Sequence, residues 1–105
     1  MPVAPGFMKD AARRAIEIRE KLPPSRRYGT LTGLKRARQI INGDNLSRST
    51  LVRMRSHLLR ARPNYRKAKS EGKTAETSKA IGAYDLWGGL RALAWANNQN
   101  KKLQK

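Results

Sequence analysis

Cysteine is absent from this sequence of 105 residues, and acidic residues are few. Without cysteine the chain can form no disulfide and offers no thiolate to a metal ion, and such a composition suits a reducing compartment. No apolar run reaches the length that crosses a membrane, and the first ten residues lack the basic start and apolar stretch of a signal peptide. We therefore expect an intracellular protein that does not associate with membranes.

Chain length limits the protein to one modest hydrophobic core. A chain of 105 residues forms at most one domain and leaves little room for a deep cleft between two lobes. We expect residues 1–105 to form a single basic helical domain whose outer surface does the binding. The sequence does not indicate its oligomeric state.

Positive charge is the largest excess in the composition. The chain has 24 lysines and arginines and seven acidic residues, which gives a net charge of +17 at pH 7. Between residues 26 and 69, ten arginines and three lysines accompany one acid, Asp44. Such a surplus repels itself unless a polyanion is near, and arginine fits phosphate oxygens better than lysine does. A surface built only for solubility usually mixes both signs. The charge therefore indicates nucleic acid as the partner.

Apolar spacing predicts helices and no strand. Residues 7–22 carry apolar side chains three and four positions apart, and the Pro23-Pro24 pair ends that segment. Thr32 can cap a second helix that ends at Gly43, a residue suited to a left-handed cap. We expect an all-α fold, a small bundle of about four helices.

A third helix is expected to begin after Ser47, a good N-cap, and to end at Pro63. Its apolar stripe comprises Leu51, Met54 and Leu58. A polar loop near residues 63–77 is expected to follow this helix.

The C-terminal part predicts a helix over residues 78–87, an interruption at Gly88 and Gly89, and a second helical piece. The second piece carries Leu90, Leu93 and Trp95. A flexible tail is expected near residues 98–105. The expected core comprises Leu34, Ile41, Leu51, Met54, Leu58, Trp87 and Trp95.

Residues 42–62 resemble the turn and second helix of a helix-turn-helix motif, so the central pair of helices is helix-turn-helix-like. The connection of six residues is longer than the usual three or four, which makes the resemblance partial. A helical wheel places one row along an edge of the apolar face and another on the far side. The first row is Arg48, Arg55 and Arg62, and the second is Arg53, His57 and Arg60. Contacts to phosphates are favoured over reading of bases. The predicted nucleic-acid-binding residues are Arg26, Arg27, Lys35, Arg36, Arg38, Arg48, Arg53, Arg55, Arg60, Arg62 and Arg66.

Aromatic residues divide into two expected groups. Trp87 and Trp95 have leucine neighbours and are expected to pack in the core rather than to stack on bases. Tyr28 and Tyr65 lie among arginines and are expected at the surface, beside a sugar or phosphate.

Catalytic chemistry finds little support in the sequence. His57 is the sole histidine, it has no carboxylate near it in sequence, and neighbouring arginines disfavour its charged form. Clustered carboxylates, zinc-ligand spacings and phosphate-binding loops are missing. We expect no enzyme activity, no metal and no cofactor.

The stretch GLKRARQIINGDNLSRSTLVRMRSHLLR is followed, after a polar gap, by LWGGLRALAWA. Together they resemble a family of small helical proteins encoded by bacteriophages, cyanophages among them, over residues 10–97. The shared pattern is RARQ, NLS, RM, and LWGG before WA. The chain departs from the family at Leu90 and Ala92, where the relatives carry an acid and a glycine, and its middle helix is richer in arginine. The resemblance implies a phage origin and a compact helical fold, with no settled activity.

Three functional classes stay open. The first is a nucleic-acid-binding protein of low sequence specificity, with DNA favoured over RNA. The second is a virion component, such as a cement or internal protein, that meets the phage capsid or the packaged genome. The third is a host-takeover protein that binds an acidic host enzyme. These classes place the protein in the host cytoplasm or in the virion.

Overall fold

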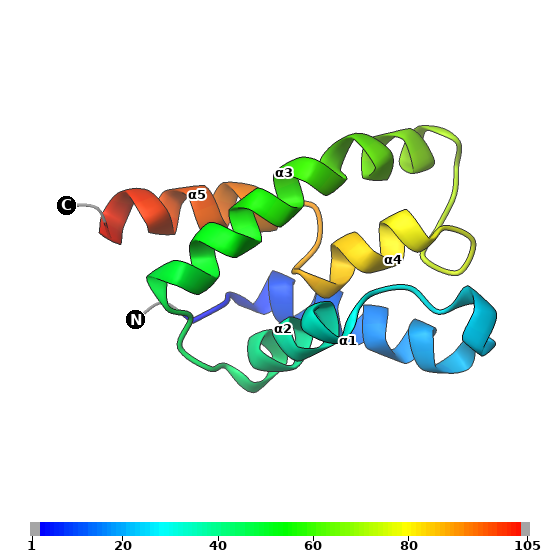
Figure 1. Ribbon diagram of the computed structural model, residues 1–105, viewed down its shortest axis with the longest axis horizontal. Helices are drawn as coiled ribbons and strands as arrows, with labels where there is room; N and C mark the ends of the chain where they lie inside the picture. The colour runs from blue at the N-terminus through cyan, green and yellow to red at the C-terminus, as the bar shows by residue number, and fades with distance from the viewer. Residues whose placement is uncertain (1–2, 104–105) are drawn as a thin grey trace.

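A computed structural model describes residues 3–103 (Figure 1). The described residues form helices and turns and contain no strand, which confirms the all-α prediction. The elements are α1 (Gly6–Lys21), the 3-10 turn η1 (Pro24–Arg26), α2 (Leu31–Asn42), α3 (Arg48–Ser70), α4 (Lys79–Leu86) and α5 (Ala92–Leu103).

The helices pack in a layered bundle around α4. Helix α3 packs against α4 and α5, and α1 packs against α2 and α4. Helix α5 runs alongside the first half of α3 in the opposite direction, whereas α1 and α2 lie on the far side of α4 (Figure 1). No helix within residues 3–103 is long and apolar enough to cross a membrane.

Local capping signals fix the ends of the two central helices. The side chain of Thr30, not the expected Thr32, accepts a hydrogen bond from the Gly33 amide at 3.1 Å and caps α2. At the other end Gly43 has φ 74°, a left-handed conformation that glycine adopts without strain. Ser47 caps α3 as predicted, because its Oγ accepts from the Thr50 amide at 3.2 Å.

Helix α3 continues past Pro63 to Ser70, so the loop predicted near 63–77 is wrong over its first half. Proline removes one backbone donor from a helix. Here Pro63 is exposed, where water can satisfy the carbonyl that it leaves without a partner. The next turns bury Tyr65 and Ala68, so packing favours continuation of the helix. The remaining connection to α4 spans residues 71–78.

The chain after α4 also differs from expectation. Gly88 and Gly89 have φ of 112° and 83°, and the backbone turns at these residues between α4 and α5. The interruption predicted at the two glycines is therefore confirmed. Leu90 precedes α5 and is 66% exposed, so it is not part of the second helical piece. Residues 98–103 are helical, which corrects the flexible tail predicted near 98–105. Residues 104–105 lie outside the described residues.

The core contains most of the predicted apolar residues. The stripe Leu51, Met54 and Leu58 is fully buried, and Trp87 is 6% exposed. Leu34, Ile41 and Trp95 are only half-buried and pack against the edge of this cluster.

The tyrosines occupy the core instead of the surface, which corrects the prediction for Tyr28 and Tyr65. The Tyr28 hydroxyl donates to the carbonyl oxygen of Ala15, and its ring fills the space beside Gly82, where a Cβ would have no room. Tyr65 stacks on Tyr84 with ring centroids 4.2 Å apart. With few large apolar residues available, the tyrosines supply much of the buried volume.

Candidate nucleic-acid interface

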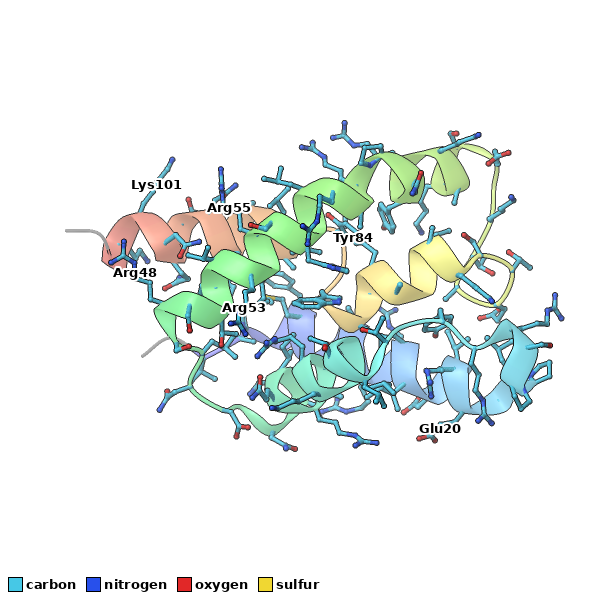
Figure 2. All side chains as sticks on the ribbon, in the orientation of Figure 1. Glu20, Arg48, Arg53, Arg55, Tyr84 and Lys101 are labelled. Carbon is cyan, nitrogen blue, oxygen red and sulfur yellow. The ribbon has the colours of Figure 1, made fainter. Side chains whose placement is uncertain are left out.

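Helix α3 presents its arginines on two sides. Arg55 lies toward α5, where its Nε donates to Asn97 Oδ1 at 2.6 Å. Arg53 lies toward α2, close enough for its charge to lower the pKa of Arg36. Figure 2 shows the same division: Arg48, Arg55 and Lys101 gather near α5, and Arg53 points toward α2. The predicted rows therefore flank α3 on opposite sides.

An apolar strip separates the two rows. The 3.6-residue helical period places Val52 and Leu59 between the Arg48-Arg55 edge and the Arg53-Arg60 edge of α3. Val52 is 46% exposed and Leu59 is 40% exposed. The outer face of α3 thus alternates basic, apolar and basic side chains across its width.

The arginines of the central segment carry no intramolecular counter-charge. Within residues 3–103 the structure has two ion pairs, Arg13–Asp10 at 3.4 Å and Lys73–Glu71 at 3.8 Å, and neither includes a predicted site residue. The exposed guanidinium groups of this segment therefore have no neutralising carboxylate among the described residues. An external polyanion would relieve their mutual repulsion.

Two predicted site residues lie apart from α3. Arg26 ends η1 and Arg27 follows it, beside the C-terminal end of α1 and far along the molecule from the first turn of α3 (Figure 1). Arg27 Nε donates to the carbonyl oxygen of Leu22 at 3.0 Å, so this arginine also closes the end of α1. Lys35 and Arg38 are exposed on α2.

Arg36 is buried, which corrects its prediction as an outward contact. It is 7% exposed, and its guanidinium carbon lies 5.7 Å from the centroid of the Trp87 ring. It donates to Gln39 Oε1, while its Nε has no partner. Burial lowers the pKa of Arg36, and the charge of Arg53 acts in the same direction. A guanidinium within about 6 Å of an indole centroid is attracted by the negative face of the ring, which helps to hold this position.

His57 stacks on the same indole, with ring centroids 4.2 Å apart and planes 19° from parallel. It lies on the same side of α3 as Arg60, whose charge acts on it, but it is half-buried against Trp87. Burial lowers the pKa of His57, and the charge of Arg60 adds to the effect. We call Arg36, His57 and Trp87 the Trp87 cluster.

A second and different environment lies on the α5 side of α3. A hollow of about 600 Å³ is lined by Val52, Arg55, Asn97, Asn100 and Lys101, and we call it the α3–α5 groove. Asn100 is 8% exposed, and neither its Nδ2 nor its Oδ1 has a hydrogen-bond partner among residues 3–103. Leaving a buried polar group unpaired costs about 1–3 kcal/mol.

The groove continues along α3. An adjoining hollow of about 220 Å³ shares Asn97 and is lined by Arg62 and Arg66 beside Tyr84. The charges of both arginines act on the Tyr84 hydroxyl against the effect of burial, which raises its pKa. Arg55 and Arg62 of the first predicted row therefore line two adjoining hollows, and Arg66 adds a further positive charge.

The α5 side of this groove lies mostly in the segment for which the sequence predicts a flexible tail. That segment is rich in asparagine and lysine. The signal that could have found it is the four-residue spacing of Ala92, Ala96 and Asn100, all buried on one face of α5.

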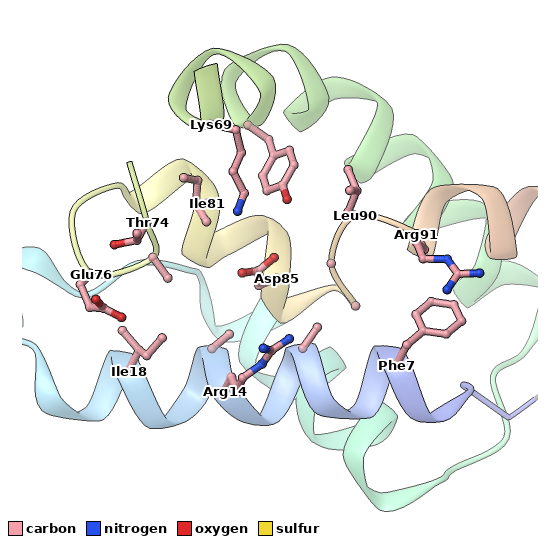
Figure 3. Close-up of a pocket in the computed structure, with 16 residues that line it drawn as sticks. Phe7, Arg14, Ile18, Lys69, Thr74, Glu76, Ile81, Asp85, Leu90 and Arg91 are labelled. Carbon is pink, nitrogen blue, oxygen red and sulfur yellow. The ribbon is translucent and has the colours of Figure 1, made fainter. Parts of the chain in front are cut away.

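A third hollow, of about 450 Å³, opens between α1 and α4 (Figure 3). Asp85 lies at its centre, with Arg14 and Lys69 on opposite sides and Glu76 at one end (Figure 3). Burial raises the pKa of Asp85 to about 6, while Lys69 and Arg14 act in the other direction. A hollow that mixes both signs does not suit phosphate. Residues 3–103 contain no group of three histidine, cysteine, aspartate or glutamate side chains that could hold a metal ion.

No protein-family model matches the chain, and neither a curated protein nor a solved structure matches it. The resemblance to small phage proteins therefore stays a prediction. The class that the fold itself defines is a small, basic, all-α protein with charged side chains on both sides of its longest helix.

Proposed function

We propose that the protein binds nucleic acid, DNA in preference to RNA, through phosphate contacts of α3 with low sequence specificity. The observation that carries the proposal is the set of arginines on α3 that no carboxylate of the described residues neutralises. Phosphate contacts supply most of the sequence-independent affinity of DNA-binding proteins.

The dimensions of α3 support this proposal. At 1.5 Å per residue, its 23 residues extend about 34 Å, which is about the length of one turn of B-DNA. Arg48 and Arg55 are seven positions apart, so their Cα atoms are separated by about 10 Å along the axis. The apolar strip between the rows offers contact with sugars but no pattern of donors and acceptors for bases, which suits phosphate contacts of low specificity.

For duplex DNA, we propose that α2 and α3 dock as a helix-turn-helix-like pair. The connection spans residues 43–47, longer than the usual turn. Helix α3 is the recognition element in this arrangement, and Lys35 and Arg38 on α2 would contact the neighbouring backbone.

The alternative classes concern protein partners. The exposed strip of Val52 and Leu59 favours a partner that combines acidic and apolar surface, as a capsid or a host enzyme can. A phage origin would fit all three classes.

The test measures binding of a labelled 30-base-pair duplex by fluorescence anisotropy at several KCl concentrations. Each phosphate contact adds about 0.9 to the slope of log affinity against log salt. We expect Arg53→Ala with Arg60→Ala to lower that slope by about two and to leave the melting temperature almost unchanged, since exposed charges add little stability. An RNA duplex of the same sequence tests the preference for DNA.

A matched control removes the same charge at positions that already have partners, Arg13→Ala with Lys73→Ala. If this control weakens binding as much as the α3 variant does, total charge and not α3 governs binding. Affinity that does not change with salt would contradict phosphate contacts altogether.

A further inference from the structure

We propose that the α3–α5 groove binds an unpaired nucleobase and that the Asn100 amide hydrogen-bonds to its edge. This inference rests on the proposed nucleic-acid binding and names the form of the ligand. It starts from Asn100, which is buried at 8% exposure and lines a hollow of about 600 Å³. Neither of its amide atoms has a hydrogen-bond partner within the described part of the chain.

The chemistry of an amide selects the class of ligand. Asparagine offers two N–H donors and a carbonyl acceptor side by side. Nucleobases carry an adjacent donor and acceptor on one edge, and asparagine pairs in this way with N6 and N7 of adenine. A phosphate offers only acceptors and would leave the Asn100 carbonyl oxygen unpartnered.

The surroundings of Asn100 fit the rest of a nucleotide. Val52 supplies an apolar wall, and Arg55 and Lys101 place positive charge at the rim, where a phosphate would lie. Arg55 already donates to Asn97 Oδ1, whereas neither amide atom of Asn100 has a partner among the described residues. Both Asn100 atoms are covered in the unbound protein, so the side chain turns into the groove when the base binds. The volume lies within the range of small-molecule sites.

The position of the groove selects an unpaired base. A base inside a duplex is stacked and paired, so it cannot enter a hollow between two packed helices unless it leaves the stack. In a single strand the base is free, and the arginines that continue along the seam can follow the backbone. Arg62 and Arg66 line the adjoining hollow on this path.

The experiment compares two single-stranded 15-nucleotide DNAs that differ only at the central position, which carries adenine in one and an abasic site in the other. We expect the wild-type protein to bind the adenine strand about ten times more tightly at one salt concentration. Asn100→Leu should abolish this difference and leave the affinity for the abasic strand unchanged. Its melting temperature should stay the same or rise, because an apolar side chain replaces an unpartnered amide.

Asn98→Leu is the matched control, since Asn98 is exposed on the same helix. It should retain the tenfold difference. Equal affinity of the wild-type protein for both strands would overturn the inference even if Asn100→Leu failed to fold. A lower melting temperature of Asn100→Leu with the tenfold difference retained would also overturn it, because Asn100 would then be structural.

Failure of the proposed function has a separate signature. In that case neither strand binds with a salt-dependent affinity. Salt-dependent binding without discrimination between the strands overturns the nucleobase site alone.

Discussion

The two sides of α3 carry similar charge and each buries polar atoms without a hydrogen-bond partner among the described residues, but they differ in what lies beside those atoms. On the α2 side, the Trp87 indole lies against both His57 and Arg36 and fills the space between the helices. On the α5 side, α3 packs on α5 around a groove in which Asn100 has no hydrogen-bond partner from the described residues. Buried polar groups are costly wherever they lack partners. Arg36 and His57 have the Trp87 ring beside them, and an aromatic face attracts a cation, whereas no aromatic residue lines the groove beside Asn100. The comparison teaches that the α2 side serves stability and the α5 side has capacity for a ligand.

The largest effect is expected from removing the Trp87 side chain, which is the centre of the Trp87 cluster on the α2 side. Trp87→Ala should lower the free energy of unfolding by about 3–5 kcal/mol, because it creates a cavity and leaves the Arg36 charge buried without its aromatic neighbour. Urea unfolding followed by circular dichroism measures this loss. Trp95→Ala is the control, since Trp95 is only half-buried and should cost clearly less. An equal loss for both would show that Trp87 packs no more tightly than an edge residue.

The next effect is a dependence of stability on pH that arises from His57, on the α2 side of α3. Burial and Arg60 lower the pKa of His57 in the folded protein, so the unfolded chain takes up a proton at a higher pH than the folded chain does. The contribution of His57 to stability is therefore present at neutral pH and is lost as pH falls below about 6.5. Urea unfolding at several values between pH 5 and pH 8 measures it.

His57→Phe retains a ring on the indole and removes the titration, so its stability should fall less on acidification than that of the wild type. The variant must be compared with the wild type at each pH. Asp85 contributes in the opposite direction: its raised pKa, about 6, makes the folded state gain stability as pH falls through that region. Parallel profiles for the two proteins would contradict the assignment to His57.

The comparison also predicts how much each row of α3 contributes to the affinity for duplex DNA and for single-stranded DNA. Arg48→Ala with Arg55→Ala removes charge beside the groove, and Arg53→Ala with Arg60→Ala removes the same charge beside the Trp87 cluster. We expect similar losses of affinity for duplex DNA, about ten- to hundredfold at low salt, because each pair removes about two phosphate contacts. For the single strand with a central adenine, the first pair should cost several-fold more than the second. Equal losses on the single strand would remove the distinction between the sides.

Much of the architecture follows from local signals in the sequence. The Ser47 cap, the Gly43 stop and the buried stripe of Leu51, Met54 and Leu58 were all predicted, because capping groups and the helical period act within a few residues. The helix end predicted at Pro63 is wrong, because α3 exposes Pro63 to water and buries Tyr65 two residues later. Both depend on tertiary packing, which local sequence signals do not show.

The sequence predicts the positive charge of the candidate site but not the arrangement of its side chains in space. The wheel separated Arg55 from Arg53 correctly, but it could not show that Arg36 and His57 converge on Trp87, which comes from a distant segment. The burial of Asn100 could not be predicted, because it arises only when α5 packs on α3 and the surrounding sequence is polar.

The smallest expected effect lies in the single polar contact that closes the groove. Arg55 Nε donates to Asn97 Oδ1 at 2.6 Å, and because the contact is exposed it should contribute no more than about 1 kcal/mol to the free energy of unfolding. A double-mutant cycle with Arg55→Ala and Asn97→Ala measures that coupling. We expect a small positive coupling, with α5 amides exchanging faster in either single variant and α2 amides unaffected. Zero coupling would mean that apolar packing alone holds α5 on α3, and the groove would then owe nothing of its shape to this pair.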